Sequence, residues 1–164
     1  YKYSCIVYGT IVEMKDNFDE NTARKAWMSL LAKAPEGRVA ALLDATMERP
    51  GFDWLRAPEI GSVMVRGRAG GSGAPFNLGE LTVTRCALTL ESGEVGHAYV
   101  QGRRKADAET AALVDALMQG QSAGRVRTAV LKPLEAERNS RVSTRAAKAA
   151  ATKVRFFTMM RGED

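Results

Sequence analysis

A glycine-rich stretch flanked by arginines, residues 66–85, is the part of the sequence whose residue types are best suited to hold an anion. Glycine permits a positive φ and lets a ligand or another chain approach the backbone closely. Backbone N–H groups together with guanidinium groups can bind a phosphate or a carboxylate. The candidate residues of this anion site are Arg66, Arg68, Gly70, Gly71, Gly73 and Arg85.

The same stretch also fits an ordinary hairpin connection, because a strand pattern precedes the glycines and another follows them. It is not a P-loop, since no Gly-Lys-Ser/Thr follows the glycines. It is not a dinucleotide-binding fingerprint either, since a strand pattern and not a helix comes next. The sequence leaves both interpretations open, a hairpin connection and an anion site.

Other chemically active side chains are few. His97 is the single histidine, and the two cysteines, Cys5 and Cys86, lack the spacing of metal ligands. We therefore expect no metal site, no histidine-based triad and no cofactor bound by this chain. Arg103 lies in a basic cluster, residues 102–105, which precedes a helical pattern and could also face an anion or a partner.

The C-terminal third carries ten Lys or Arg residues against four Asp or Glu, within a net charge of +5 for the whole chain. Its bases recur at intervals of three and four, so they share one face of a helix. This face is either solvated or binds an acidic partner or nucleic acid. The residues of this basic face are Arg138, Arg141, Arg145 and Lys148.

Four large apolar side chains follow the basic face and are costly to leave in water. They fall within five residues, so strict strand alternation cannot place them all on one sheet face. They form either a last core strand or, as we expect, a docking segment for a partner chain. These residues are Phe156, Phe157, Met159 and Met160.

The periodicity of apolar residues predicts an α+β fold with two N-terminal helices, an antiparallel sheet of about four strands, a following helix and a long C-terminal helix. Residues 121–127 are expected to form a loop, and 128–131 a strand or a short helix. The predicted helices span about 21–34, 35–48, 106–118 and 134–152, and the predicted strands 52–57, 62–68, 81–90 and 95–101, with a turn at 58–61.

Two details of the predicted sheet can be tested. The apolar face of strand 81–90 changes sides near Arg85, which indicates a β-bulge or a strong twist there. A two-residue loop after this strand would pair Leu88 with His97 and would place His97 on the apolar face next to Tyr99. At that position His97 would either pack or face a ligand.

Length and composition limit the classes of protein. The 164 residues suggest one domain, and we expect residues 1–13 to be an upstream extension and 14–164 a single domain. No run of apolar residues is long enough to span a membrane. The cysteine usage is typical of a reduced, cytoplasmic protein.

Three segments together resemble one family: RGRAGGSGAPFNLGELTVTRC at 66–86, GHAYVQGRRKADAETAALVDALMQ at 96–119 and KVRFFTMMRGED at 153–164. Arg24 and Trp27 in the first helix fit as well. The chain resembles the G subunits of the bacterial carbon–phosphorus lyase system, the PhnG family. The resemblance covers residues 22–164, and the order and spacing of its segments make it specific.

The resemblance implies a subunit of a heteromeric complex of phosphonate catabolism. Such subunits act with H-, I- and L-type proteins to join a phosphonate to the ribose C1 of ATP with displacement of adenine, and a J-type subunit later cleaves the product. It places the nucleosidase chemistry on the I-type and the iron–sulfur chemistry on the J-type subunit. ATP is then a substrate of the complex, and two copies of this chain are present in it.

This chain itself is therefore expected to assist and not to catalyse alone. An alternative function is a free-standing basic module that binds RNA or phosphate ligands, with nucleic acid the less favoured partner. An independent transferase is the weakest reading, because no pair of base and nucleophile is visible in the sequence.

Overall fold

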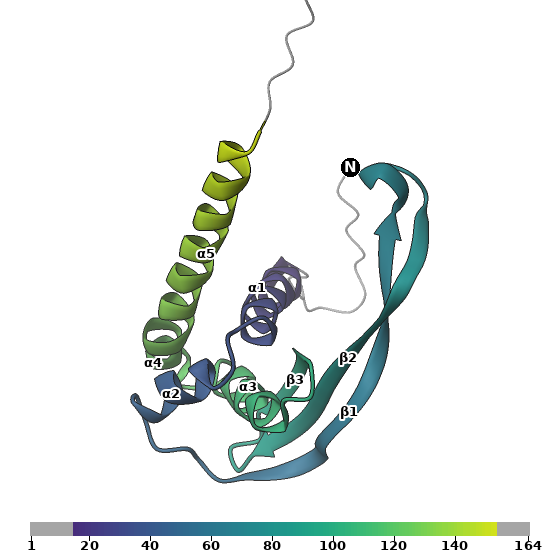
Figure 1. Ribbon diagram of the computed structural model, residues 1–164. Coiled ribbons are helices and arrows are strands. Elements are labelled where there is room, and N and C mark those ends of the chain that lie inside the picture. Colours follow the sequence, from purple (N-terminus) through teal and green to yellow (C-terminus); the bar gives the residue numbers. More distant parts are fainter. Residues whose placement is uncertain (1–14, 154–164) are drawn as a thin grey trace, which may run out of the picture.

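The computed structural model describes residues 15–153, with side chains from residue 21 onward. It confirms the α+β class (Figure 1). In chain order the elements are α1 (Lys15–Ala32), α2 (Arg38–Asp44), β1 (Phe52–Arg68), β2 (Pro75–Leu90), β3 (Val95–Gln101), α3 (Lys105–Leu117), α4 (Ala123–Val126) and α5 (Lys132–Ala151), with a 3₁₀ turn at Ala69–Gly71 and a π-helical turn at Arg127–Leu131.

The described sheet has three antiparallel strands in the order β1-β2-β3, one fewer than predicted. The predicted strands 52–57 and 62–68 are one continuous strand, β1, so the predicted turn at 58–61 is wrong. Pro58 can lie inside this strand because β1 is at the edge of the sheet and its register breaks between Arg56 and Glu59. A residue without an N–H costs little at an edge bulge.

The irregularity expected near Arg85 is present, but in the neighbouring strand. Arg85 faces Glu59 and Ala87 faces Arg56, so β1 carries the extra residue. The pairing of β2 with β3 runs without a break through the same region. The bulge therefore changes the course of β1 while β2 and β3 stay regular.

The turn between β2 and β3 differs from the prediction by one residue. Leu88 faces Gly96 and Ala87 faces His97, because the loop has three residues and its Gly93 takes a φ of 98°. A three-residue loop ending in a left-handed glycine is a common hairpin connection. A shift of one residue turns every side chain to the other face, so the prediction that His97 lies on the apolar face is wrong.

Helix α3 is the centre of the core. It is buried on nearly all sides, and Leu113, Leu117, Val114 and Met118 form a buried stripe at helical spacing along it. Strand β3 crosses α3 so closely at Gly96 that a Cβ there would collide with the carbonyl oxygen of Ala112. The strands β2 and β3 and the helices α1 and α2 surround α3, together with the turn that leads into α5.

The prediction of a loop at 121–127 is wrong, since α4 and the π-helical turn lead directly into α5. Val126, Val130 and Leu134 are all buried and recur every four residues, a helical spacing. The two N-terminal helices are confirmed, although α2 begins at Arg38, after the left-handed Gly37. No helix within residues 15–153 has the length and apolar character needed to cross a membrane.

Two parts of the molecule extend beyond the core (Figure 1). One is the outer half of the β1–β2 hairpin, residues 60–82, which we call the arm. The other is the second half of α5, in which every residue from 138 onward is exposed. In the described part of α5, Leu134 is the buried residue that connects this helix to the core.

Candidate partner-binding surfaces

A buried carboxylate connects the elements of the core. Asp115 on α3 is fully buried and accepts hydrogen bonds from Arg24 Nη2 at 2.6 Å, from Trp27 Nε1 at 2.8 Å and from the backbone N–H of His97 at 2.9 Å. Both of its oxygens therefore have partners. Asp115 is a fixed structural anion that joins α1 and β3 to α3, and it is not free to act as a general base.

The sequence analysis missed this cluster. Arg24 also donates to the carbonyl of Val95 at 3.0 Å, so the same guanidinium group holds the start of β3. One signal was available in the sequence: a lone aspartate stands inside the apolar helix of residues 111–118, where a charge is costly without a partner.

The basic cluster at 102–105 divides into a structural and an exposed part. Arg104 donates to the carbonyls of Gln101 and Ala34 and to Asp107 Oδ2. This guanidinium group thereby joins β3, the end of α1 and the start of α3. Arg103 and Lys105 are exposed, so these two members of the cluster remain accessible to a partner.

Arg85 and His97 lie on the face of the sheet that points away from α3, the outer face. Arg85 Nε donates to Glu59 at 2.6 Å. Its hydrogen bond to Glu59 raises the pKa of Arg85 above the usual value. This bond occupies Arg85 Nε, and the same carboxylate also lies 3.3 Å from Arg56 Nη1, so Glu59 is shared by two guanidinium groups and stands where an anion would approach them.

The glycines form the tip of the arm, as the hairpin interpretation expects. Gly70 and Gly71 have φ values of 58° and 82°, which are unfavourable for other residues. The tip closes on itself, since the N–H of Gly73 donates to the Ala69 carbonyl and Arg68 Nη1 donates to the Gly73 carbonyl. This closure directs Arg68 into the tip.

The structure does not bring the predicted anion-binding arginines together. Arg68 lies nine positions along β1 from Glu59, which faces Arg85. At about 3.3 Å per residue this is roughly 30 Å. Arg66 and Arg68 therefore belong to the arm, and Arg85, His97 and Arg103 to the body of the sheet.

The arm exposes an unusual amount of apolar surface. Leu78 is 67% exposed and Met64 is 52% exposed, and the arm holds three further large apolar side chains that are 42–46% exposed, distributed over both of its faces. Monomeric proteins rarely leave such a group of side chains in water. The apolar residues of the arm are Ile60, Met64, Phe76, Leu78 and Leu81.

The second half of α5 presents a different surface. Residues 138–153 hold five bases and no acid, and all of them are exposed. The predicted basic face of Arg138, Arg141 and Arg145 is thus accessible along its whole length. The apolar segment with Phe156, Phe157, Met159 and Met160 lies outside the described residues.

Reactive groups are scarce in the described part of the chain. No group of three or more His, Cys, Asp or Glu side chains there could hold a metal ion. Cys86 is a free thiol whose pKa is raised to about 12, mainly by burial. A thiol in this state is a poor nucleophile near neutral pH.

Comparison with known proteins gives two results. The family model described as "Phosphonate metabolism protein PhnG" matches residues 22–162. A relative from Rhizobium meliloti (strain 1021), described as "Alpha-D-ribose 1-methylphosphonate 5-triphosphate synthase subunit PhnG", is 44% identical over 141 residues. This alignment covers 86% of the present chain and 90% of the relative.

Proposed function

The chain belongs to the PhnG family of phosphonate metabolism proteins, and we propose that it is a subunit of a complex that makes alpha-D-ribose 1-methylphosphonate 5-triphosphate from ATP and methylphosphonate. The observation that carries this proposal is the 44% identity to a relative described as a subunit of that synthase, over nearly the full length of both chains. The partners we propose are the H-, I-, J- and L-type subunits.

Within such a complex, we propose that this chain assembles and supports the other subunits and does not catalyse alone. The surfaces described above favour this role, because the arm and the second half of α5 bury almost nothing within the described chain. If a partner covered the five apolar side chains of the arm, their transfer out of water would contribute roughly 5 kcal/mol to the free energy of binding, before the cost of association is subtracted.

The basic half of α5 would act mainly on encounter and orientation. Five exposed bases without an acid attract an acidic surface over a distance of about one Debye length. Such complementarity raises association rates and selects the partner more than it adds affinity. We therefore assign the arm to affinity and α5 to recognition.

The same basic helix is the observation that favours the alternative, a free-standing module that binds RNA or phosphate ligands. The pairing of Arg85 with Glu59 weighs against a phosphate site on the body of the sheet, and the closure of the glycine tip weighs against one in the arm. Within the described residues, the exposed bases of α5 and the cluster at 102–105 would remain for such a ligand. Binding to an RNA oligonucleotide by the isolated chain, lost in Arg141→Glu/Arg145→Glu, would support this alternative.

Co-expression with tagged H-, I- and J-type subunits tests the proposed function. We expect the wild-type chain to co-purify, and Met64→Ser/Leu78→Ser on the arm to lower the yield at least tenfold. Arg141→Glu/Arg145→Glu should lower the co-purification yield by a smaller factor than the arm variant does. Its effect should be larger at low salt than at high salt, because salt screens exposed charges. Leu55→Ser is the matched control, because Leu55 is 59% exposed but lies on β1 outside the arm.

Adenine release from ATP and methylphosphonate, measured with the L-type subunit present, completes the test. The complex should release adenine and the isolated chain should not. Turnover by the isolated chain at the rate of the complex would contradict the assembly role. Full co-purification of both surface variants would show that the partners bind elsewhere.

A further inference from the structure

Strand β3 forms one edge of the sheet, and half of its backbone groups point away from β2. Gly102 donates its N–H to Thr82, so the even-numbered residues of β3 face β2. The odd-numbered residues, from Val95 to Gln101, direct their N–H and C=O groups outward. The bond from the His97 N–H to Asp115 confirms this direction.

The two ends of this edge are occupied by side chains of the same molecule. The carbonyl of Val95 accepts hydrogen bonds from Arg24 and Gln119, and the N–H of His97 donates to Asp115. At the other end, the carbonyl of Gln101 accepts one from Arg104. These contacts prevent a long strand from pairing along the whole of β3.

The middle of the edge has no partner within residues 15–153. The outward groups there are the carbonyl of His97, both backbone groups of Tyr99 and the N–H of Gln101. A set of alternating acceptors and donors of this kind can pair with one short strand. An extended chain is the ligand whose backbone matches it.

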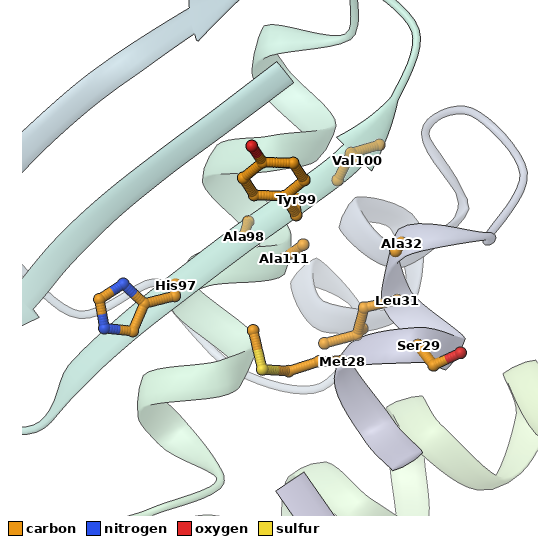
Figure 2. Close-up of a pocket in the computed structure, with 9 residues that line it drawn as sticks. All are labelled: Met28, Ser29, Leu31, Ala32, His97, Ala98, Tyr99, Val100 and Ala111. Carbon is orange, nitrogen blue, oxygen red and sulfur yellow. The ribbon is translucent and has the colours of Figure 1, made fainter. Parts of the chain in front are cut away.

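A groove runs beside this open segment (Figure 2). It has a volume of about 220 Å³ and lies between β3 and α1. Met28 extends from α1 toward the strand, and Ala98 and Val100 form the floor with Ala111. An edge strand beside a helix is the arrangement in which several peptide-binding domains add a strand.

The charges around the groove indicate what kind of chain it takes. Its described lining holds no carboxylate. Lys33 reaches Ser29 on the wall of the groove at 3.1 Å, Lys25 lies one turn earlier on α1, and Arg103 is exposed just after β3. A segment with apolar side chains at alternate positions and acidic residues at its ends would fit the groove and this rim.

We propose that the open edge of β3 binds an extended segment of a partner subunit, which adds as a fourth strand between β3 and α1. The proposal rests on the proposed function, since it takes the partner from the same complex. A second copy of this chain is the less suitable occupant, because the chain carries a net charge of +5 and the rim is basic.

Hydrogen exchange of single amides tests the proposal in the intact complex. We expect the amides of Tyr99 and Gln101 to exchange at least tenfold more slowly in the co-expressed complex than in the isolated chain. The amides of Val100 and Gly102, which face β2 in both states, serve as internal references. Unchanged exchange at Tyr99 and Gln101 in a complex that has formed would overturn the proposal.

A pair of variants at one position tests the same bond. Tyr99→Pro removes the outward N–H, a change that an edge strand tolerates, whereas Tyr99→Val keeps it. Both lose the phenol ring, so the difference between them reports the backbone donor. We expect Tyr99→Pro to co-purify about tenfold less than Tyr99→Val, and equal yields would overturn the proposal.

The remaining outcomes separate this inference from the proposed function. Protection of Tyr99 in the isolated chain that increases with protein concentration would assign the edge to a second copy and overturn the proposal. Failure of the wild-type chain to form any complex would overturn the proposed function and this inference with it. If Tyr99→Pro does not fold, the exchange measurement on the wild-type protein decides.

Discussion

Helix α3 and the arm both contain many apolar residues, eight of thirteen in α3 and nine of twenty-three in the arm, but they bury them very differently. In α3, ten of thirteen residues are buried. In the arm, every residue of β2 from Pro75 to Thr82 is exposed, including Phe76 and Leu78. The difference is one of surroundings, because α3 lies against the sheet and two helices while the arm has only its own paired strands.

This contrast separates two tasks within one chain. The packing around α3 determines the fold, since its residues have all their neighbours in the same molecule. The arm and the second half of α5 add little to that packing, so their sequence is free to suit something outside it. In a subunit of a complex, we expect substitutions around α3 to change stability and substitutions on the projections to change assembly.

The largest expected effect is at the contact of β3 with α3. Gly96→Ala places a methyl group against the carbonyl oxygen of Ala112 and should lower the free energy of unfolding by about 3 kcal/mol, the upper part of the usual range for overpacking. Gly79→Ala is the matched control in the arm, where nothing lies within 4 Å of the added atom.

Urea denaturation of both glycine variants provides the measurement. Gly79→Ala should leave the free energy of unfolding within about 1 kcal/mol of the wild type. The added methyl group meets nothing in the folded arm, so its main effect is to lower the conformational entropy of the unfolded chain. If the two variants are destabilised equally, the arm packs against the core in solution and the contrast drawn above is wrong.

Removal of the buried carboxylate should have the next largest effect. Asp115→Ala leaves Arg24, Trp27 and the N–H of His97 without their acceptor. We expect the free energy of unfolding to fall by about 2–3 kcal/mol. Glu80→Ala on the arm removes an exposed carboxylate and should cost less than about 0.5 kcal/mol. Thermal unfolding of the two variants measures the difference.

A smaller loss for Asp115→Ala, equal to that of Glu80→Ala, would show that water replaces the carboxylate and that α1 is held by its apolar contacts alone. The His97 amide gives a second readout. Its hydrogen exchange should become faster in Asp115→Ala and stay unchanged in Glu80→Ala, because the carboxylate of Asp115 protects it directly.

The smallest effect at neutral pH concerns the Cys86 thiol, whose contribution appears only above pH 9. Burial raises its pKa from 9.0 to about 12. As the pH rises above 9, the unfolded chain releases this proton first, so the free energy of unfolding should fall by up to about 1.4 kcal/mol per pH unit until pH 12. Below pH 9 both states keep the proton and this contribution does not vary.

The free energy of unfolding of the wild type minus that of Cys86→Ala, measured at each pH, isolates this contribution. Lysines and tyrosines titrate in both proteins, so their contributions cancel. A Cys5→Ser background allows the second test, in which Cys86 should react with a thiol reagent at pH 8 far more slowly in the folded than in the unfolded chain. Equal rates would mean that the core opens readily around β2.

The sequence by itself determined most of the helical and extended segments, although not the continuity of β1 or the helical turns after residue 122. It also determined which family the chain resembles. These properties depend on residues close together in the chain, such as the stripe of Leu113 and Leu117 in α3 and the helical spacing of the bases in α5. The family resemblance likewise depended on the order of short segments. The tip glycines and the exposed basic face were predicted for the same reason.

Only the tertiary structure decided the properties that depend on residues far apart. The register of β2 and β3 followed from one left-handed residue, Gly93, and it moved His97 to the outer face. Pro58 could remain inside a strand because β1 has a neighbour on one side only. Asp115 found its partner Arg24 at a distance of 91 residues, and no local pattern specifies a contact of that range. Long-range packing fixes which faces of the chain are covered, and so which surfaces remain for a partner.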